Sequence, residues 1–183
     1  MLKKVRGFTL IELLIVVAII GILAALLIPN AITAIQKSKQ KGTMKDITTI
    51  ATGSADFITD QGAWANANPP VTHAGPLAQG DAFLQALAPF YIKIVPVNDN
   101  WGNPFEVYLG DGCIGQRGIL DTDVGDDDFV IESLTRDGLG DGWTYDASDP
   151  TNGMYIIQSM ADFKNDLVSW SGSWIRAPRT AVQ

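Results

Sequence analysis

The chain has 183 residues, of which 46% are hydrophobic and 18% are charged, and its formal net charge is −7. This length predicts one globular domain, or one domain with an appendage. The acidic balance disfavours a nucleic-acid binder, because phosphate contacts need a basic surface. One cysteine, Cys113, excludes an internal disulfide, and one histidine, His73, leaves little room for histidine-based catalysis. Five tryptophans and seven phenylalanines argue against a disordered chain.

The N-terminus has a short basic segment followed by a long apolar run. Three basic residues lie within residues 1–7, and in residues 8–28 only Thr9 and Glu12 interrupt the apolar side chains. As a helix, residues 8–28 span about 31 Å, which is enough to cross the core of a bilayer. The basic residues predict that this end stays in the cytoplasm. This uneven composition disfavours a purely cytosolic enzyme.

A cleaved secretory signal is the alternative explanation of this run. The apolar region of such a signal usually has about 7–15 residues and ends at small residues. Here Ala24 and Ala25 are followed by three more apolar residues, and helical spacing continues beyond Pro29. A long helix from Leu10 to about Thr59 is therefore favoured over a signal that is removed.

Glu12 and Pro29 are unusual in a plain membrane anchor. An unpaired carboxylate is costly among lipid tails, and a proline removes a helix hydrogen bond. Two explanations stay open for the pair. Either Glu12 reaches the headgroups and Pro29 marks the exit from the membrane, or both residues serve the function of the chain.

After the helix the sequence predicts short elements separated by turns. A turn at Asp60–Gly62 ends the helix, and Ala65–Gly80 forms a loop. The other expected elements are a helix at Asp81–Leu87 capped by Asp81, an extended segment at Tyr91–Val97, strands at Phe105–Leu109, Phe129–Leu134 and Met154–Ser159, and a strand or irregular segment at Leu167–Ile175. One long helix followed by a small antiparallel sheet is an α+β fold.

The N-terminal segment resembles a known processing signal. Residues 3–7 read KKVRG and Phe8–Leu13 reads FTLIEL, and this pattern is similar to the prepilin signal of type IV pilins and type II secretion pseudopilins. Gly21 and Pro29 stand at the spacing that this superfamily uses. The resemblance implies cleavage between Gly7 and Phe8 by a membrane prepilin peptidase, followed by N-methylation of the Phe8 amine.

The resemblance also implies how subunits assemble. The new cationic amine of Phe8 would be neutralised by Glu12 of a neighbouring subunit, so that each buried charge has a partner. Gly21 and Pro29 would weaken the helix between them and let the filament stretch. The implied organisation is a leader (residues 1–7), a membrane and assembly half-helix (8–28), an amphipathic half-helix (29–60) and a head (61–183).

A run of turn-forming residues indicates which subgroup of this superfamily the chain resembles. Residues 96–105 read PVNDNWGNPF, which resembles a run that precedes the first sheet strand in major pseudopilins of type II secretion systems. Asn100 replaces the residue that is usual in that run. We expect a structural turn without chemistry, in which Trp101 plugs the sheet against the long helix, Gly102 adopts an unusual backbone angle, and Asn103 and Pro104 lead into the strand.

An acidic tract follows. Residues 121–149 contain ten acidic residues and one basic residue, Arg136, among several glycines. Carboxylates on flexible loops suit Ca²⁺, which takes six to eight oxygen ligands. Residues 137–142 begin like an EF-hand loop but lack its terminal glutamate and its flanking helices, so an EF-hand is rejected.

The resemblance implies one set of calcium ligands. The entry to the Gly-rich loop of major pseudopilins matches Ser133–Gly138, with Thr135 in place of a usual glycine. The expected side-chain ligands are Asp137, Asp162 and Asp166, with backbone oxygens near Leu134, and this choice makes residues 138–161 an insertion. A rival closure uses Asp141 and Asp146, and a solvated acidic loop without metal is the third alternative.

Taken together, the patterns predict a structural filament subunit rather than an enzyme. By resemblance, it would be the major pseudopilin of a type II secretion system, anchored in the bacterial inner membrane with its head outside the cytoplasm. Its implied partners are copies of itself, minor pseudopilins, the prepilin peptidase, an assembly platform with its ATPase, and lipid before assembly, with no nucleic acid. The alternative is a type IV pilin for adhesion, motility, DNA uptake or electron transfer. A third hypothesis, an anchored periplasmic enzyme, lacks a nucleophile–base pair or a phosphate loop.

Overall fold

The computed structural model describes residues 7–179, so the basic leader residues Lys3, Lys4 and Arg6 lie outside the described residues. The chain forms two compact units that divide between Lys37 and Ser38. The second unit therefore takes in the C-terminal half of the long helix together with the head.

The long helix α1 runs from Leu10 to Gln61, which confirms the predicted helix. Pro29 lies inside α1 without ending it. Gly62, with φ of +84°, follows the last residue, and its N–H donates to the carbonyl oxygen of Ile58 at 2.7 Å. This left-handed glycine satisfies one of the free carbonyls at the helix end, as the predicted turn requires.

The two halves of α1 differ in what surrounds their side chains. In the N-terminal half the large apolar side chains are exposed; Leu26 and Leu27, for example, are 70% and 69% exposed. Among the described residues, α1 is the helix that is long and apolar enough to cross a membrane. The buried residues of α1 recur every three or four positions from Gln40 to Phe57. That spacing places them on a single face of the C-terminal half.

The head contains a six-stranded sheet and one short helix. The strands are β1 (Ala74–Pro76), β2 (Glu106–Leu109), β3 (Phe129–Ser133), β4 (Met154–Tyr155), β5 (Leu167–Trp170) and β6 (Ser173–Pro178), and the short helix is α2 (Ala82–Leu87). Short 3₁₀ turns occur at Trp64–Asn66, Gly110–Cys113, Gln116–Gly118, Asp121–Asp123 and Asp162–Lys164. The order across the sheet is β1-β2-β3-β5-β6-β4, and every neighbouring pair is antiparallel except β4 with β6. The α+β class is confirmed.

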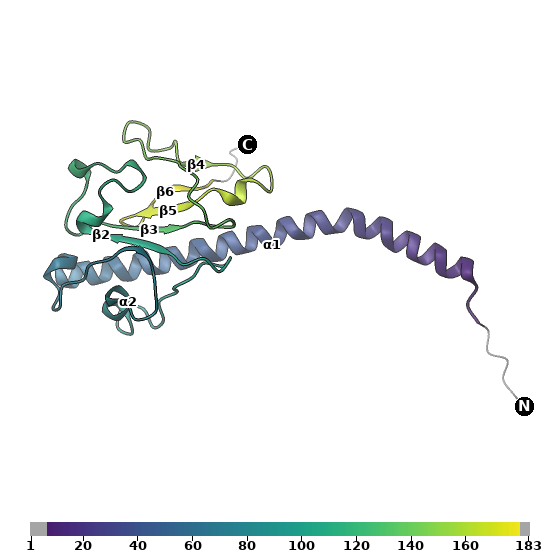
Figure 1. The fold of residues 1–183 in the computed structure, drawn as a ribbon, viewed down its shortest axis with the longest axis horizontal. Helices are drawn as coiled ribbons and strands as arrows, with labels where there is room; N and C mark the ends of the chain where they lie inside the picture. The colour runs from purple at the N-terminus through teal and green to yellow at the C-terminus, as the bar shows by residue number, and fades with distance from the viewer. Residues whose placement is uncertain (1–6, 180–183) are drawn as a thin grey trace, which may run out of the picture. The chain divides into compact units, whose positions relative to one another are not determined.

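The sheet is covered on both faces. Side chains from β2, β3 and β5, together with Phe105 just before β2, form the inner core with the buried face of α1. The larger side chains are Phe105, Val107, Ile131 and Leu167 with Ile47, Ile50 and Phe57. Val130, Val168 and Ile175 point the other way and pack with Cys113 and Ile119. Figure 1 shows the C-terminal half of α1 along one side of the sheet, and the loops between β2 and β3 and between β3 and β4 on the other.

The strands expected at Phe105–Leu109 and Phe129–Leu134 are confirmed as β2 and β3. Leu167–Ile175 lies within a hairpin, β5 and β6, whose two-residue turn is Ser171 (φ +45°) and Gly172 (φ +84°). Two positive φ angles match the turn type that suits the twist of a tight hairpin. The strand predicted at Met154–Ser159 shortens to two residues.

Three expectations from the sequence were incomplete or wrong. Tyr91–Val97 forms no strand; Ile92 and Val95 enter the inner core from an irregular segment instead. The loop expected at Ala65–Gly80 contains the short edge strand β1. Asp81 precedes α2 as predicted, but its side chain accepts from the N–H of Ala78 at 2.7 Å rather than capping the helix.

Removing the side chain of Phe105 should destabilise the head strongly. This side chain is fully buried in the inner core, and Phe→Ala changes in cores cost about 3–5 kcal/mol. We expect Phe105→Ala to lower the free energy of unfolding by that amount in a denaturant titration of the full chain in detergent. The matched control is Phe90→Ala, because Phe90 is 82% exposed and should change stability by less than about 0.5 kcal/mol. Equal losses in the two variants would contradict the placement of Phe105.

Candidate functional site

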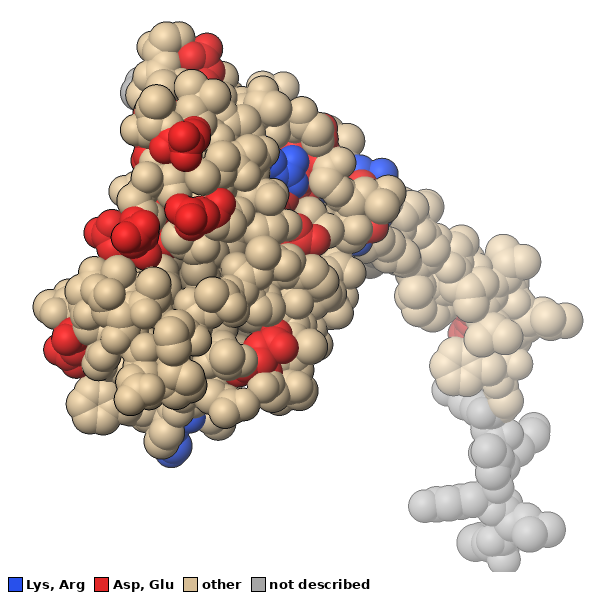
Figure 2. Space-filling view, turned by 60° about the vertical axis from the view of Figure 1, so that its left-hand side comes forward, with Lys and Arg blue, Asp and Glu red and all other residues tan. Residues whose placement is uncertain are grey.

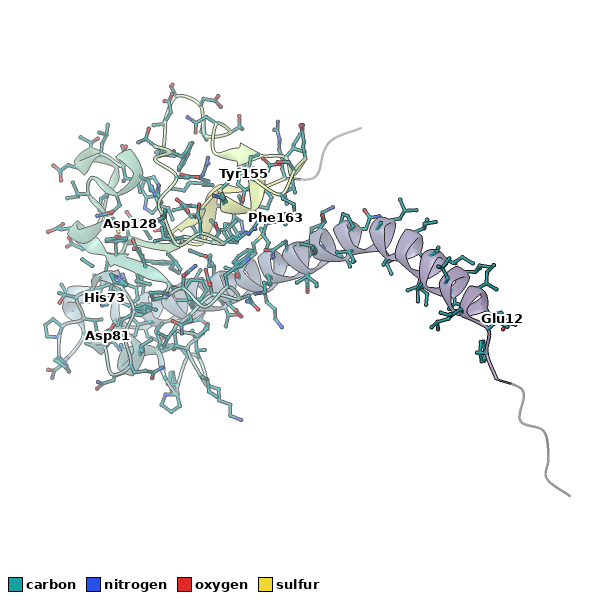
Figure 3. The ribbon with its side chains drawn as sticks, turned by 45° about the vertical axis from the view of Figure 1, so that its right-hand side comes forward. Glu12, His73, Asp81, Asp128, Tyr155 and Phe163 are labelled. Atoms are coloured by element: carbon teal, nitrogen blue, oxygen red, sulfur yellow. The ribbon has the colours of Figure 1, made fainter. Side chains whose placement is uncertain are left out.

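Thr9 and Glu12 form a reciprocal hydrogen-bonded pair at the start of α1. The backbone N–H and the hydroxyl of Thr9 donate to Oε2 of Glu12 at 2.9 and 2.7 Å, and the N–H of Glu12 donates to Oγ1 of Thr9 at 3.3 Å. This is a capping box, which satisfies backbone donors that the first turn of a helix leaves free. Figure 3 shows Glu12 at this end of the helix. A threonine followed three residues later by a glutamate is the sequence signal that could have predicted this pair.

Two of the predicted assembly residues, Phe8 and Glu12, lie close together in sequence at the start of α1. Glu12 lies in the first turn, shortly after Phe8, and Phe8 is 85% exposed. Gly7, the predicted cleavage position, is also exposed. Cleavage between Gly7 and Phe8 stays a prediction.

Gly21 and Pro29 leave α1 continuous. A Cβ built on Gly21 would meet no atom within 4 Å, so nothing in this chain requires glycine there. Around Pro29, the Thr33 hydroxyl donates to the Pro29 carbonyl at 3.1 Å, and the Asn30 amide donates to the Leu26 carbonyl at 3.3 Å. Weakening of this segment in a filament stays a prediction.

The predicted turn is organised by a residue that the sequence pattern did not single out. Asp99 is 6% exposed, and its Oδ1 accepts the backbone N–H groups of Trp101 and Gly102 at 2.8 Å and of Asn103 at 2.9 Å. Its Oδ2 accepts the hydroxyl of Ser133, at the end of β3, at 2.7 Å. One buried carboxylate therefore holds the whole turn, and three converging N–H groups stabilise its charge.

The turn also ties α1 to the sheet. The N–H of Asn100 donates to the Thr43 hydroxyl at 3.1 Å, and its side-chain amide donates to Asp46 at 3.0 Å. The side chain of Asn103 donates to the carbonyl oxygen of Thr135 at 2.5 Å. The predicted structural role of the turn fits these contacts.

Within the turn, Gly102 has a φ of +100°, which is the unusual backbone angle expected there. The expectation for Trp101 was wrong. Trp101 is half-buried and belongs to neither buried cluster, whereas Phe105, after Pro104, fills the inner core. The turn is held by polar contacts to Asp99, so its tryptophan does not have to fill the core.

The three predicted calcium ligands do not gather around a common point. Asp137 is partly exposed and pairs with Lys164 at 3.5 Å. Asp162, the first residue of a 3₁₀ turn, accepts the N–H groups of Gln158 and Ser159 in the preceding segment, at 2.8 and 2.6 Å. Within residues 7–179, no group of three or more His, Cys, Asp or Glu side chains is arranged to hold a metal. The residues present therefore do not fit the predicted calcium site.

Asp166 instead joins an arginine cluster, formed by Arg117, Glu132, Asp141, Asp166 and Arg176. The Arg117 guanidinium donates to Glu132 and to Asp166, and it lies 3.4 Å from Asp141. Arg176 donates to Asp141 through Nε at 2.7 Å and is ion-paired with the same carboxylate. The rival calcium closure used Asp141 and Asp146. Asp141 lies beside Asp166, whose carboxylate accepts its backbone N–H at 2.8 Å. Asp146 does not join them, and its carboxylate accepts the N–H of Ser148 at 2.8 Å.

The other acidic residues of the tract lie mostly at the surface. Figure 2 shows acidic side chains over the visible face of the head and few basic ones. The exposed acidic residues of the tract are Asp121, Asp123, Asp126, Asp127, Asp137, Asp141, Asp146 and Asp149, although only 13% of the side chain of Asp141 is exposed. Water can solvate these exposed carboxylates.

Comparisons with known proteins find matches to the N-terminal segment and to most of the chain. Residues 2–28 match the family model of the prokaryotic N-terminal methylation motif. The type II secretion system core protein G of Aeromonas hydrophila is 32% identical over 140 residues, which cover 70% of this chain and 92% of that protein. The chain belongs to the type II secretion core protein G family. This is the family of major pseudopilins that the tryptophan turn and the N-terminal segment predict.

Two further relatives mark the breadth of the similarity. The core protein G of Pseudomonas aeruginosa is 32% identical over 159 residues, covering 79% of this chain and 93% of that protein. The type IV major pilin protein PilA of Myxococcus xanthus is 46% identical over 61 residues, covering 33% of this chain and 28% of that protein. No solved structure matches the chain at a significant level.

In this pseudopilin the buried carboxylates of the arginine cluster titrate differently. Burial raises the pKa of Asp166 to about 6, against the lowering effect of the Asp141 N–H and of Arg117. Burial alone would also raise the pKa of Asp141, but the N–H groups of Trp143 and Asp166, together with Arg176, lower it. At pH 7 both groups are therefore mainly ionised and both can pair with arginine.

Loss of the Asp99 carboxylate should unfold the turn. In Asp99→Ala, three buried N–H groups and the Ser133 hydroxyl lose their acceptor, and we expect a loss of about 3 kcal/mol in the free energy of unfolding. Chemical denaturation of the full chain measures this loss. Asp123→Ala, at an exposed position, is the control and should stay within about 0.5 kcal/mol of the unaltered chain. A neutral Asp99→Ala would refute the central role of this carboxylate.

The raised pKa of Asp166 predicts a pH dependence of stability. Because the folded state binds this proton more tightly than the unfolded state, its stabilising effect is complete below the usual pKa of 3.8 and is lost as the pH rises through about 6. Relative to Asp166→Asn, the unaltered chain should lose about 2 kcal/mol of unfolding free energy between these pH values. Denaturant titrations at several pH values measure the difference. A difference that stays constant, or grows with pH, would mean that burial does not dominate at this carboxylate.

Proposed function

We propose that this chain is the filament-forming subunit, the major pseudopilin, of a type II secretion system. The observation that carries the proposal is the division of α1 in this family member. Its N-terminal half carries the prepilin motif and exposed apolar side chains, and its C-terminal half packs into the hydrophobic core of the head. Such a chain needs lipid or other helices around its N-terminal half, because water is a poor solvent for that surface.

Processing would precede assembly. The prepilin peptidase would cleave between Gly7 and Phe8, and methylation would follow on the Phe8 amine. The matched methylation motif over residues 2–28 supports both steps. The basic leader residues would keep the N-terminus in the cytoplasm, so the head would fold on the other side of the inner membrane.

Assembly would exchange lipid contacts for contacts with neighbouring helices. The Phe8 amine carries a positive charge once the leader is removed, and Glu12 of a neighbouring subunit offers a negative one. In the single chain the Glu12 carboxylate already accepts two hydrogen bonds from Thr9, so it is satisfied before a neighbour arrives. The charge pair would then set the axial step between subunits, since misplaced subunits would leave both charges unpaired among apolar side chains.

The mechanical role would be to push exported proteins outward. An ATPase and a membrane platform would add subunits from the inner membrane, and the growing short filament would act on proteins that have already folded. Minor pseudopilins would accompany the major subunit.

The head suits a structural rather than a catalytic role. Cys113 is fully buried, and burial raises the pKa of its thiol to about 12, so it stays protonated and unreactive at neutral pH. The ring of His73 lies 3.2 Å from the carbonyl oxygen of Gly75 and stacks against Phe83. Both residues therefore serve the packing of the head.

A surface type IV pilin is the second candidate. The similarity to the Myxococcus xanthus pilin supports it, although that similarity covers 33% of the chain. Core protein G relatives match along most of the chain, which favours the secretion pseudopilus. Deletion of the gene separates the two functions, because loss of protein export follows from the first and loss of adhesion or motility from the second.

The assembly model predicts that Glu12→Ala leaves the chain in the membrane but abolishes normal filaments. Replacing Gly7 with a bulkier residue should do the same by blocking cleavage. Electron microscopy of filaments and membrane fractionation, in cells with the peptidase and assembly platform, give the two readouts. Asp123→Ala in the head is the control and should form filaments as the unaltered chain does. Abundant intact filaments from both Glu12→Ala and the Gly7 variant would overturn the assembly model.

A further inference from the structure

We propose that the arginine cluster, rather than a bound calcium ion, closes the Gly- and Asp-rich loop of this head. Calcium was the expectation that the family resemblance suggested for Asp137, Asp162 and Asp166. Of these three, only Asp166 reaches the cluster, and the other two have local partners. The inference does not depend on whether the filament serves secretion or a surface pilus.

The cluster joins segments that are distant in sequence. Arg117 comes from the loop after β2, Glu132 from β3 and Asp166 from the residue before β5. Arg117 lies 15 residues from Glu132 and 49 residues from Asp166 in the chain. One guanidinium therefore links three segments of the head on the sheet face opposite α1, which is the work that a multivalent cation would do.

The five side chains are largely shielded from water. Asp166 is fully buried, Glu132 is 3% exposed, and Arg117, Arg176 and Asp141 are 11%, 12% and 13% exposed. Buried ion pairs are strongly destabilised when one member is removed, because the remaining charge loses its partner. The cluster is thus a place where one arginine controls the stability of the loop.

The backbone at Arg117 has an unusual conformation. Arg117 has a φ of +49°, a left-handed conformation that is rare for non-glycine residues, and it lies between Gly115 and Gly118, which have φ of +80° and +79°. Its carbonyl oxygen accepts the N–H of Tyr145 at 2.5 Å. A strained φ angle of this kind is kept only where several surrounding contacts hold the residue in place.

The segment of residues 138–161, between β3 and β5, completes the cluster. Its Asp141 exchanges hydrogen bonds with Asp166: the backbone N–H of each donates to the other's carboxylate, at 2.8 and 3.1 Å. The guanidinium of Arg176 lies 5.1 Å from the ring centre of Trp143 and 5.5 Å from that of Tyr155, at cation–π distance. Figure 3 labels Tyr155 in this region, beside the yellow-green strands of the sheet.

Tyr155 extends the contacts to the long helix. Its hydroxyl donates to the carbonyl oxygen of Asn165 at 3.3 Å and accepts from Gln40 of α1 at 3.1 Å. Burial raises the pKa of this hydroxyl, so it remains protonated and able to donate. The segment of residues 138–161 is therefore packed around Arg176 and hydrogen-bonded to α1.

The charges argue against calcium at the same place. Three carboxylates and two guanidinium groups leave a net charge of −1 when all are ionised. Ca²⁺ needs six to eight oxygens and would lie beside Arg117, whose like charge repels it. Oδ1 of Asp166 is buried without a hydrogen-bond partner among the described residues, but a single oxygen does not make a coordination shell.

Thermal unfolding of the full chain in detergent tests the inference. The melting temperature should be unchanged, within error, by EDTA or by millimolar CaCl₂. Arg117→Met should lower it by roughly 10 °C, because a buried charge cluster loses its central cation. Arg136→Met is the matched control, since Arg136 is exposed and its side chain donates to the backbone carbonyl of Met160 at 3.2 Å; it should shift the melting temperature by about 2 °C or less.

Two results would overturn the inference. One is a melting temperature of the unaltered chain that rises with calcium and falls with EDTA, with MgCl₂ as the ion control. The other is an Arg117→Met variant that melts as Arg136→Met does. Because the calcium titration uses the unaltered chain, it decides the question even where Arg117→Met does not fold.

Discussion

The packing of the C-terminal half of α1 against the inner face of the sheet is the contact on which the rest of the head depends. Ile47, Ile50 and Phe57 meet side chains of β2, β3 and β5 in one apolar core. Burial of this kind is the main favourable term in folding. Since the N-terminal half of the same helix is apolar and has no buried face, the C-terminal half anchors the head and leaves the N-terminal half free for lipid or other subunits.

The two faces of the sheet are stabilised by different physics. The inner face is closed by apolar packing against α1, whereas the outer face combines a small apolar cluster with the buried charges around Arg117. β3 carries both, because Ile131 points inward and Glu132 points outward along the same strand. An acidic surface and the long loop of residues 138–153 can therefore be accommodated on the outer face without disturbing the core that fixes the C-terminal half of α1.

Many elements were predictable because their signals are local. The apolar run and its continuation past Pro29 predicted α1, and alternating residues predicted β2 and β3. The turn around Gly102 was also predicted. The role of its central residue was not predicted, because the family pattern includes Asp99 only as one polar residue of the run. Only the fold shows that three N–H groups and Ser133 converge on it.

By itself the sequence determined the long N-terminal helix, its processing motif and the α+β class, since each rests on residues that are neighbours in the chain. The tertiary structure alone decided the partners of the acidic residues. Arg117 stands in a Gly-rich segment with no sign of its role, and the family resemblance had suggested Asp166 as a metal ligand. They lie 49 residues apart in the chain, and only the fold brings them together and buries both side chains.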